Sequence, residues 1–215
     1  GYLLATGQII DNEPAVKRIM VGELALDGGI RKINGALSIA QAASKNSISE
    51  IILPLKNAPE AAMVKGIKVV PVSNLIQVID YIESKIKIPP QAPTRLTERK
   101  VETRVNISDI KGNHSAKRAL MIAAAGGHNL LMVGPPGTGK TMLAQALVSI
   151  LPPPSSKEVV EITKIYSAAG LLNNLPFISQ RPFRAPHQTA SIASVIGGGQ
   201  NPRPGEISLA HRGVL

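Results

Sequence analysis

The sequence predicts an α/β protein built from two successive units, and three features carry this prediction. Short apolar runs alternate with helix-like segments through residues 1–88, which is typical of a sheet covered by helices. At residues 134–141 the glycine-rich loop GPPGTGKT stands between an apolar run and a helix-like segment, in the order strand, loop, helix. Between these regions, a proline-rich stretch at 89–93 and a charged stretch at 95–104 predict a linker over residues 89–104.

Composition limits the classes of protein that the chain can belong to. Its 215 residues are 44% apolar and 18% charged, which suits a globular protein with a buried core. No apolar run reaches the length of a membrane span, and no basic-then-apolar leader follows Gly1. The absence of cysteine excludes disulfides and thiolate metal sites and fits a reducing compartment. We therefore expect a cytoplasmic protein with no membrane partner.

The net charge of +10 is unevenly distributed. Residues 1–88 hold 10 basic and 8 acidic side chains, whereas residues 89–215 hold 14 and 6. Surplus positive charge favours a polyanionic partner, of which nucleic acid is the usual one. The alternative is a solvated surface whose charge an acidic segment elsewhere in the protein offsets, and charge alone does not decide between the two.

The first unit is expected to begin with a hairpin and a helix. Residues 20–26 and 30–33 flank a turn at Asp27-Gly28-Gly29, and an alanine-rich helix follows at 36–45, ending at Asn46. The remaining expected elements are a strand at 50–54, a helix capped by Asn57 and running to Met63, a strand at 67–71, and a helix begun at Ser73 or Asn74 with Leu75, Ile76, Ile79 and Ile82 on one face.

The second unit, residues 105–215, is expected to surround the glycine-rich loop. A helix is predicted at 115–125, a buried parallel strand at 129–133 and a helix at 142–151 that stops at three prolines. Another helix is predicted from Ser156 to Ala168, with Gly170 as its stop. The abundance of proline and glycine beyond residue 181 predicts an ordered system of loops or hairpins.

The loop at 134–141 has the residue pattern that a triphosphate requires. Its glycines permit backbone angles that turn N–H groups toward phosphate oxygens, Lys140 supplies a positive charge, and the Thr141 hydroxyl can ligate Mg²⁺. An ordinary glycine turn is the alternative, which the strand and helix on either side disfavour. We therefore expect ATP and Mg²⁺ to bind, with nucleotide contacts from Gly134, Pro135, Pro136, Gly137, Thr138, Gly139, Lys140 and Thr141.

The stretch GELALDGGIRKING at residues 22–35 resembles the C-terminal half of the Lon-protease-like domain, which is similar to domain 2 of ribosomal protein S5. This resemblance implies the fold of residues 1–88. In Lon peptidases a catalytic lysine follows the hairpin, but the matching position here falls at or near Leu37, and no lysine occurs between Lys32 and Lys45. A serine nucleophile would have no base, so the resemblance argues against peptidase activity.

Four segments together resemble the magnesium-chelatase-like AAA+ ATPases of the ComM/YifB type: AAAGGHNLL at 123–131, GPPGTGKT, RPFRAPH at 181–187 and NPRPGEISLAHRGVL at 201–215. The resemblance implies that residues 105–215 are the first part of an AAA+ domain with a parallel sheet. The Walker B acidic pair would lie beyond Leu215, so we expect no catalytic residue within the chain. The chain is also expected to start inside the Lon-like domain.

In AAA+ ATPases a D-[IV]-x-G segment borders the adenine, which implies contacts from Ile110 and Gly112. The alternative is a helix lead-in capped by Ser108 or Asp109. The resemblance further implies an ATP-driven motor that forms a homo-hexamer and acts on DNA, with residues 1–215 binding nucleotide but hydrolysing it poorly. Two alternatives stay open: a chaperone-like ATPase that remodels a protein or assists metal insertion, and a nucleotide-gated scaffold without turnover.

The segment from Gly170 to Leu215 contains four arginines, no lysine and one acid, Glu206. Arginine can form two hydrogen bonds to one phosphate, and neighbouring prolines stiffen the loops that present it. We hypothesise that Arg181, Arg184 and Arg203 contact a nucleic-acid backbone. The alternative is structural: these arginines stack on Phe177 or Phe183, or bond to loop carbonyls.

Overall fold

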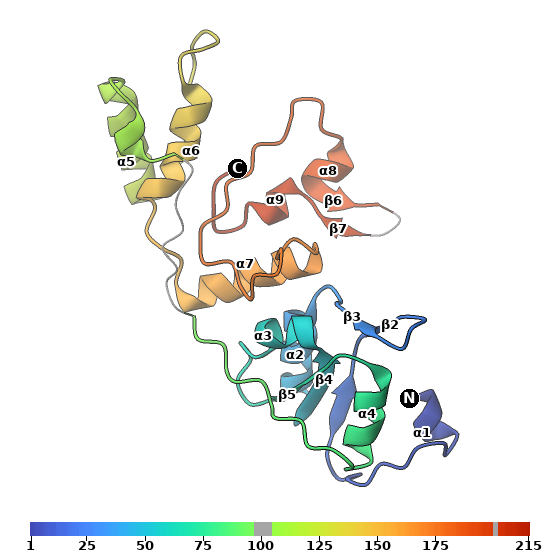
Figure 1. The fold of residues 1–215 in the computed structure, drawn as a ribbon. Helices are drawn as coiled ribbons and strands as arrows, with labels where there is room; N and C mark the ends of the chain where they lie inside the picture. The colour runs from blue at the N-terminus through green and yellow to red at the C-terminus, as the bar shows by residue number, and fades with distance from the viewer. Residues whose placement is uncertain (97–104, 200–201) are drawn as a thin grey trace. The chain divides into compact units, whose positions relative to one another are not determined.

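The computed structural model describes residues 1–96, 105–199 and 202–215, and the chain forms two compact units (Figure 1). The first comprises Gly1–Leu96 and Thr163–Phe177, and the second comprises Thr97–Ile162 and Ile178–Leu215. The grouping differs from a single division at the linker because residues 163–177 pack with the first unit. The part of the expected linker at 97–104 lies outside the described residues.

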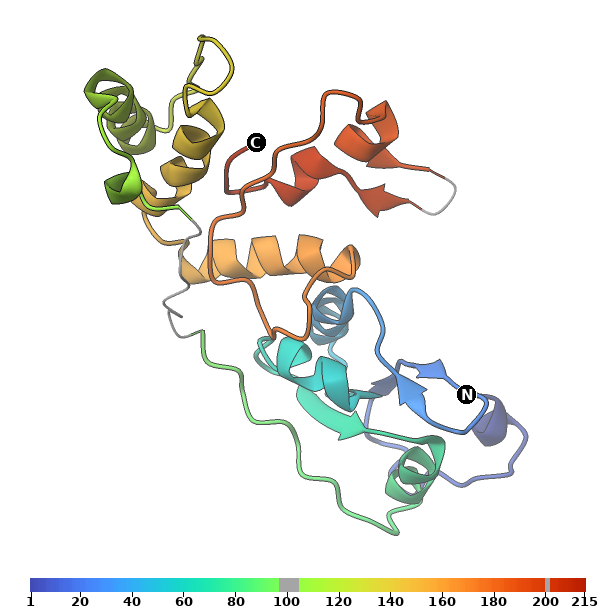
Figure 2. The same cartoon turned by 45° about the horizontal axis from the view of Figure 1, so that its top comes forward.

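A three-stranded parallel sheet forms the centre of the first unit, which confirms the expected α/β class. Its strands are β1 (Arg18–Met20), β4 (Glu50–Pro54) and β5 (Lys68–Val72), in the order β1-β4-β5 (Figure 2). Ile51 of β4 stands opposite both Ile19 and Val69. The β4 and β5 predictions are thus correct to within one residue.

Helices cover both faces of this sheet. Ile51 and Leu53 pack with α2 (Ala36–Lys45) and α3 (Ala58–Ala61) in one buried cluster. Ile52 lies in a second cluster, with Val70 of β5 and residues of α4 (Leu75–Ile82). Because both faces are buried, β4 reads as a continuous apolar run rather than an alternating one.

The remaining elements of the first unit lie before the sheet or connect its strands. The helix α1 (Tyr2–Ala5) opens the chain, and the 3₁₀ turn η1 (Leu55–Asn57) follows β4. The expected hairpin is present as the antiparallel strands β2 (Glu23–Leu24) and β3 (Ile30–Arg31). Met20 belongs to the parallel sheet instead.

Two expectations in the first unit are wrong, both because of tertiary contacts. Asn57 stands at the N-cap position of α3, but its side chain makes no capping hydrogen bond. Its buried amide instead accepts from Ile33 N (3.0 Å) and donates to Ile33 O (2.9 Å), and α3 ends short of Met63. In α4, Val78 and Ile82 face the core while Ile76 is 69% exposed. Asn74 caps α4 by accepting a hydrogen bond from Gln77 N (2.9 Å).

The second unit is mainly helical among the residues described. Its core joins Ile110, Leu120, Leu143 and Ala146. No helix in the described ranges is both long enough and apolar enough to cross a bilayer. Its elements in chain order are η2 (Ile107–Asp109), α5 (His114–Gly126), α6 (Lys140–Ile150), α7 (Ser156–Ala168, ending in the first unit), α8 (Ile192–Ile196), β6 (Gly197–Gly198), β7 (Arg203–Pro204) and α9 (Glu206–Leu209).

The expected buried strand at residues 129–133 is not formed. Leu131 and Val133 are 87% and 88% exposed, and no strand of the described residues pairs with this segment. A strand is stabilised by the ladder to its neighbour, so an apolar run without a neighbour stays irregular. The segment nevertheless leads directly into the glycine-rich loop.

The proline-rich half of the linker lies against the first unit. Gln91 N donates to Val69 O of β5 (2.8 Å), and Thr94 N donates to Ala62 O (3.1 Å). The Thr94 hydroxyl adds a bond to Pro59 O (2.5 Å). Residues 89–94 are therefore attached at two points rather than running free between the units.

The position that matches the Lon lysine is apolar and buried. Leu37 is 1% exposed, and its N–H donates to Glu60 Oε1 (2.8 Å). The same carboxyl accepts from the Ser167 hydroxyl, and Asn57 Nδ2 lies 3.4 Å from Glu60 Oε2. Ser167 Oγ in turn accepts from Gly35 N (2.9 Å). This site is a buried hydrogen-bond network in which no lysine takes part.

We expect Ser167→Ala to destabilise the chain by about 1–3 kcal/mol, because the buried Glu60 carboxylate loses the Ser167 hydroxyl as a donor. Urea unfolding followed by circular dichroism measures the change. Ser73→Ala, at an exposed serine of the same unit, is the matched control. Equal unfolding free energies for the two variants would contradict a stabilising role for the network.

Candidate nucleotide-binding site

The glycine-rich loop turns sharply into α6. Gly137 and Gly139 have φ angles of +84° and +82°, in the left-handed region that favours glycine. Gly139 is the N-cap residue, and Leu143 N donates to its carbonyl (2.9 Å), which closes the first turn of the helix. These two glycines let the chain reverse between the 130–133 segment and α6.

The Lys140 side chain folds back over the loop. Its Nζ donates to Gly134 O and to Pro135 O, both at 2.8 Å. The Thr138 hydroxyl also donates to Pro135 O (2.9 Å). The ammonium is thus held at the loop by two carbonyls, and an anion that reaches Lys140 competes with them.

A pocket of about 460 Å³ lies beside the loop, within the range of small-molecule sites. Lys140 and Thr138 are on its polar side. The rest of the lining comes from the N-cap and first half of α5, from the 130–133 segment, from the loop itself and from α6: Asn113, Ser115, Ala116, Ala119, Leu130, Leu131, Met132, Val133, Gly134, Pro135 and Leu143. None of these described residues is acidic.

The two residues expected beside adenine, Ile110 and Gly112, do not line this pocket. Ile110 is buried in the unit's core, and its carbonyl accepts a hydrogen bond from Lys117 Nζ. Gly112 adopts a left-handed turn (φ +67°) just before the lining residue Asn113. Sequence reasoning missed the α5 residues of the lining, although the small side chains of Ser115, Ala116 and Ala119 indicate a helix face with room for a ligand.

The residues of the loop fit a phosphate group with a divalent cation. A Cβ at Gly134 would stand 3.3 Å from Thr138 Oγ1, so glycine permits this close approach. The loop opens at the N-terminus of α6, where the helix dipole favours an anion. Lys140 brings the positive charge, and Thr141, exposed in the first turn of α6, offers a hydroxyl that can ligate Mg²⁺.

Of the three candidate nucleic-acid arginines, Arg181 and Arg184 are paired with carboxylates. Arg181 forms two hydrogen bonds with Glu158 (3.2 and 3.3 Å) and bonds to the carbonyls of Pro152 (2.6 Å) and Arg212 (2.8 Å). Arg184 forms a two-pronged pair with Glu206. The bonds of Arg181 to two carbonyls agree with the structural alternative. Arg184 also has a structural partner, but that partner is a carboxylate rather than an aromatic ring or a loop carbonyl.

Arg203 lies in a different environment, exposed on the β6–β7 hairpin. The base of this hairpin is tight: a Cβ at Gly205 would come within 2.3 Å of Gly197 N. The backbone that presents Arg203 therefore depends on glycine at position 205.

Ser155 and Glu158 form a capping box at the start of α7. The Glu158 carboxylate accepts from Ser155 N (2.8 Å), and the Glu158 N–H donates to Ser155 Oγ (3.4 Å). The Ser155 N–H, followed by the Arg181 guanidinium, lowers the pKa of Glu158 to about 2. Both partners favour the ionised carboxylate.

Comparison with known proteins gives matches over the whole chain. The family model described as "Magnesium chelatase, subunit ChlI" matches residues 106–215, and one described as "Subunit ChlI of Mg-chelatase" matches residues 1–57. The chain is 41% identical to competence protein ComM of Haemophilus influenzae over 221 residues, and 40% identical to uncharacterized protein YifB of Escherichia coli K12 over 213.

In both cases the match covers 99% of this chain and 42% of the relative. An uncharacterized protein of Mycobacterium tuberculosis H37Rv is 41% identical over 199 residues, which are 92% of this chain and 39% of that protein. The chain thus spans about two fifths of the length of the curated relatives that it matches.

The pKa of Glu158 predicts how the Glu158–Arg181 pair responds to acid. Because the folded pKa lies below the ordinary value of 4.5, the stabilisation is complete above about pH 4.5 and is lost as the pH falls toward 2. A double-mutant cycle of Glu158→Gln and Arg181→Gln should therefore give a coupling free energy at pH 7 that shrinks at pH 2.5. A coupling that does not change with pH would show that the pair is not ionic.

Proposed function

This chain belongs to the magnesium chelatase subunit ChlI family of AAA+ proteins, and from that premise we propose that its second unit binds ATP with Mg²⁺ at residues 134–141. The observation that carries the proposal is the loop itself. Two left-handed glycines precede α6, and the Lys140 ammonium lies over the loop, 2.8 Å from two carbonyls. Exchanging these carbonyls for the β- and γ-phosphates needs only a rotation of the lysine side chain.

The remaining parts of the pocket suit the other parts of a nucleotide. Leu130, Leu131, Ala116 and Ala119 offer apolar surface for a base. Thr141 would hold Mg²⁺ through its hydroxyl, and the bound ion would neutralise phosphate charge. Lys140 would orient the phosphates as a point charge.

Binding without efficient hydrolysis is proposed for residues 1–215. Turnover of a nucleoside triphosphate needs a carboxylate that anchors the metal and a group that orients the attacking water. The described lining of the pocket contains no carboxyl group. We therefore assign ATP hydrolysis to the intact protein, which we propose acts as a homo-hexamer.

Action on DNA is the second part of the proposal. The surplus of 14 basic over 6 acidic side chains in residues 89–215 supports a polyanionic partner, and one of the relatives is named a competence protein. The competing role is protein remodelling or metal insertion, and the description of the family as a magnesium chelatase subunit supports it. Stimulation of the intact protein's ATPase by DNA would separate the two.

We expect Lys140→Ala to weaken binding of a fluorescent ATP analogue in Mg²⁺ by about 1.5–3 kcal/mol, the contribution of a charge-assisted hydrogen bond. This corresponds to roughly a 10- to 150-fold rise in Kd. Lys157→Ala, at an exposed lysine of α7 outside the pocket, should leave the affinity unchanged. Equal affinities of wild type and Lys140→Ala would contradict the assignment of the loop as the phosphate-binding part of the site.

For the DNA role, we expect Arg203→Ala in the intact protein to reduce the salt slope of DNA binding by about 0.7 to 0.9, the loss of one phosphate contact. The effect should be the same for unrelated DNA sequences. The measurement is a series of binding titrations at increasing salt, with Lys157→Ala as the control. A parental slope in a folded Arg203→Ala protein would leave Arg203 without a role in DNA binding.

A further inference from the structure

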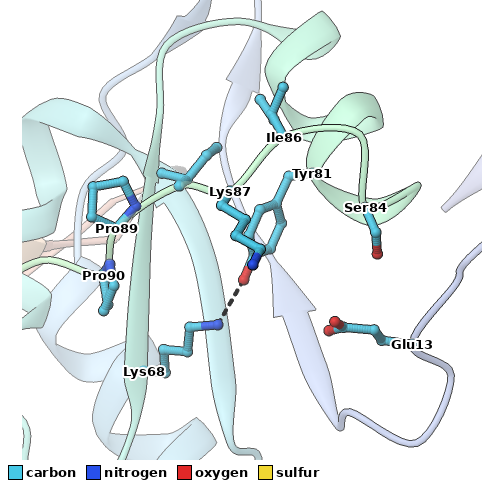
Figure 3. Close-up of a pocket in the computed structure, with 9 residues that line it drawn as sticks. Glu13, Lys68, Tyr81, Ser84, Ile86, Lys87, Pro89 and Pro90 are labelled. Atoms are coloured by element: carbon cyan, nitrogen blue, oxygen red, sulfur yellow. Dashed lines mark hydrogen bonds between the residues drawn. The ribbon is translucent and has the colours of Figure 1, made fainter.

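A second pocket, of about 480 Å³, lies in the first unit and is formed only by residues of that unit (Figure 3). Lys68 enters it from β5 and Tyr81 from α4, and the two side chains meet in a hydrogen bond. Glu13 stands on the opposite rim. No part of this pocket belongs to the proposed nucleotide site.

The polar floor of the pocket rests on a buried carboxylate. Glu50 is 1% exposed, and its Oε2 lies 2.8 Å from Lys68 Nζ and 2.7 Å from the Tyr81 hydroxyl, which donates to it. Lys68 Nζ also donates to the Tyr81 oxygen (2.8 Å). Arg18 Nε stands behind the carboxylate, 3.5 Å from Oε1.

These contacts use only part of the hydrogen-bonding capacity of Lys68. An ammonium has three donors, and Glu50 and Tyr81 take two of them. The Lys68 side chain is 46% exposed where it lines the pocket. Its hydrogen bond to Glu50, followed by that to Tyr81, raises the pKa of Lys68, so the ammonium is positive throughout the neutral range.

The remaining walls are mostly apolar. Ile86, Ile88, Pro89 and Pro90 form one side, along the segment that leaves α4. Lys87 adds a second ammonium to the lining. The carboxylate of Glu13 already has a partner in Arg18, 3.4 Å away, whereas Glu50 is covered by Lys68 and Tyr81. Among the lining residues, Lys68 and Lys87 carry two positive charges against the one negative charge of Glu13. A ligand therefore meets a lining with a net positive charge next to an apolar wall.

We propose that this pocket binds a carboxylate that carries an apolar chain. The carboxylate would take the third donor of Lys68 and the ammonium of Lys87, and the apolar chain would lie on the isoleucine and proline wall. A small organic acid and the C-terminal residue of a peptide share this chemistry. A structural Lys68–Glu50 pair alone would not need an open, partly apolar space above its ammonium.

Two probes test the proposal on the whole chain: 3-phenylpropionate for a free acid and N-acetyl-Ala-Phe for a peptide C-terminus. The amide of each probe is the control for charge. Saturation-transfer NMR detects contact, and calorimetric titration gives Kd. We expect at least one acid to bind, and its amide to have a Kd at least tenfold higher. The acid that binds more tightly identifies the source of the ligand.

Variants connect the binding to the pocket. Lys87→Gln should raise Kd about fivefold and Lys68→Gln at least tenfold. Lys85→Gln should have no effect, because Lys85 pairs with Glu83 and does not line the pocket. If Lys68→Gln fails to fold, Lys87→Gln decides. Absence of binding by both acids, or a Kd that does not change in Lys87→Gln, would overturn the proposal.

Discussion

The first unit depends on the hydrogen bonds that the Glu60 carboxyl group accepts. This group is buried, and it accepts from the Leu37 N–H at the start of α2 and from the Ser167 hydroxyl near the end of α7. Asn57, beside it, holds the chain leaving the hairpin at Ile33. A buried polar group is tolerated only when its partners are present. The start of α2 and the end of α7 therefore have to pack around Glu60 in the same folded structure.

This dependence explains why residues 163–177 pack with the first unit although about ninety residues separate them from β5. Gly35 N donates to both the carbonyl and the hydroxyl oxygen of Ser167. The polar network lies beside Leu37, where the resemblance to Lon peptidases would place a lysine, and its described members bond to one another.

The parts of the fold that the sequence predicts well are those determined by nearby residues. The bounds of α2 and β4 agree with the expected ones, and α7 begins and ends as predicted, because caps, alanine content and prolines act locally. The glycine-rich loop belongs to this class, since its two left-handed turns require only glycine at 137 and 139. The conformation of the loop at Gly137 and Gly139 was therefore predictable from the sequence, whereas the nucleotide contacts of residues 134–141 stay a prediction.

The parts that were not predictable depend on contacts distant in sequence. The sequence allows the Asn57 side chain to cap a helix, but in the fold that side chain bonds to Ile33. The sequence also allows Ile76 to face the core, but Val78 and Ile82 are the α4 residues that pack against the sheet. The segment at 129–133 is apolar but has no neighbouring strand among the described residues. The pocket beside the loop likewise needed α5 in place before Ser115 and Ala119 could be assigned to it.

The charge of the C-terminal segment also differs between the local sequence and the folded structure, because acids distant in sequence pair with its arginines. Counted along the sequence, residues 170–215 hold four arginines against Glu206. In the second unit, two further acids come from α7: Glu158 pairs with Arg181, and Glu161 with Arg212 at 2.9 Å.

The hydrogen bonds from these arginines and from Ser155 lower the pKa of Glu158, Glu161 and Glu206, so the three acids stay ionised at neutral pH. A phosphate that sought Arg181 or Arg184 would have to displace a carboxylate that already makes two hydrogen bonds with the same guanidinium, and such an exchange gains little. The basic composition of the segment therefore overstates the charge that a nucleic acid would meet, which directs the DNA hypothesis to the exposed Arg203 on its glycine-dependent hairpin.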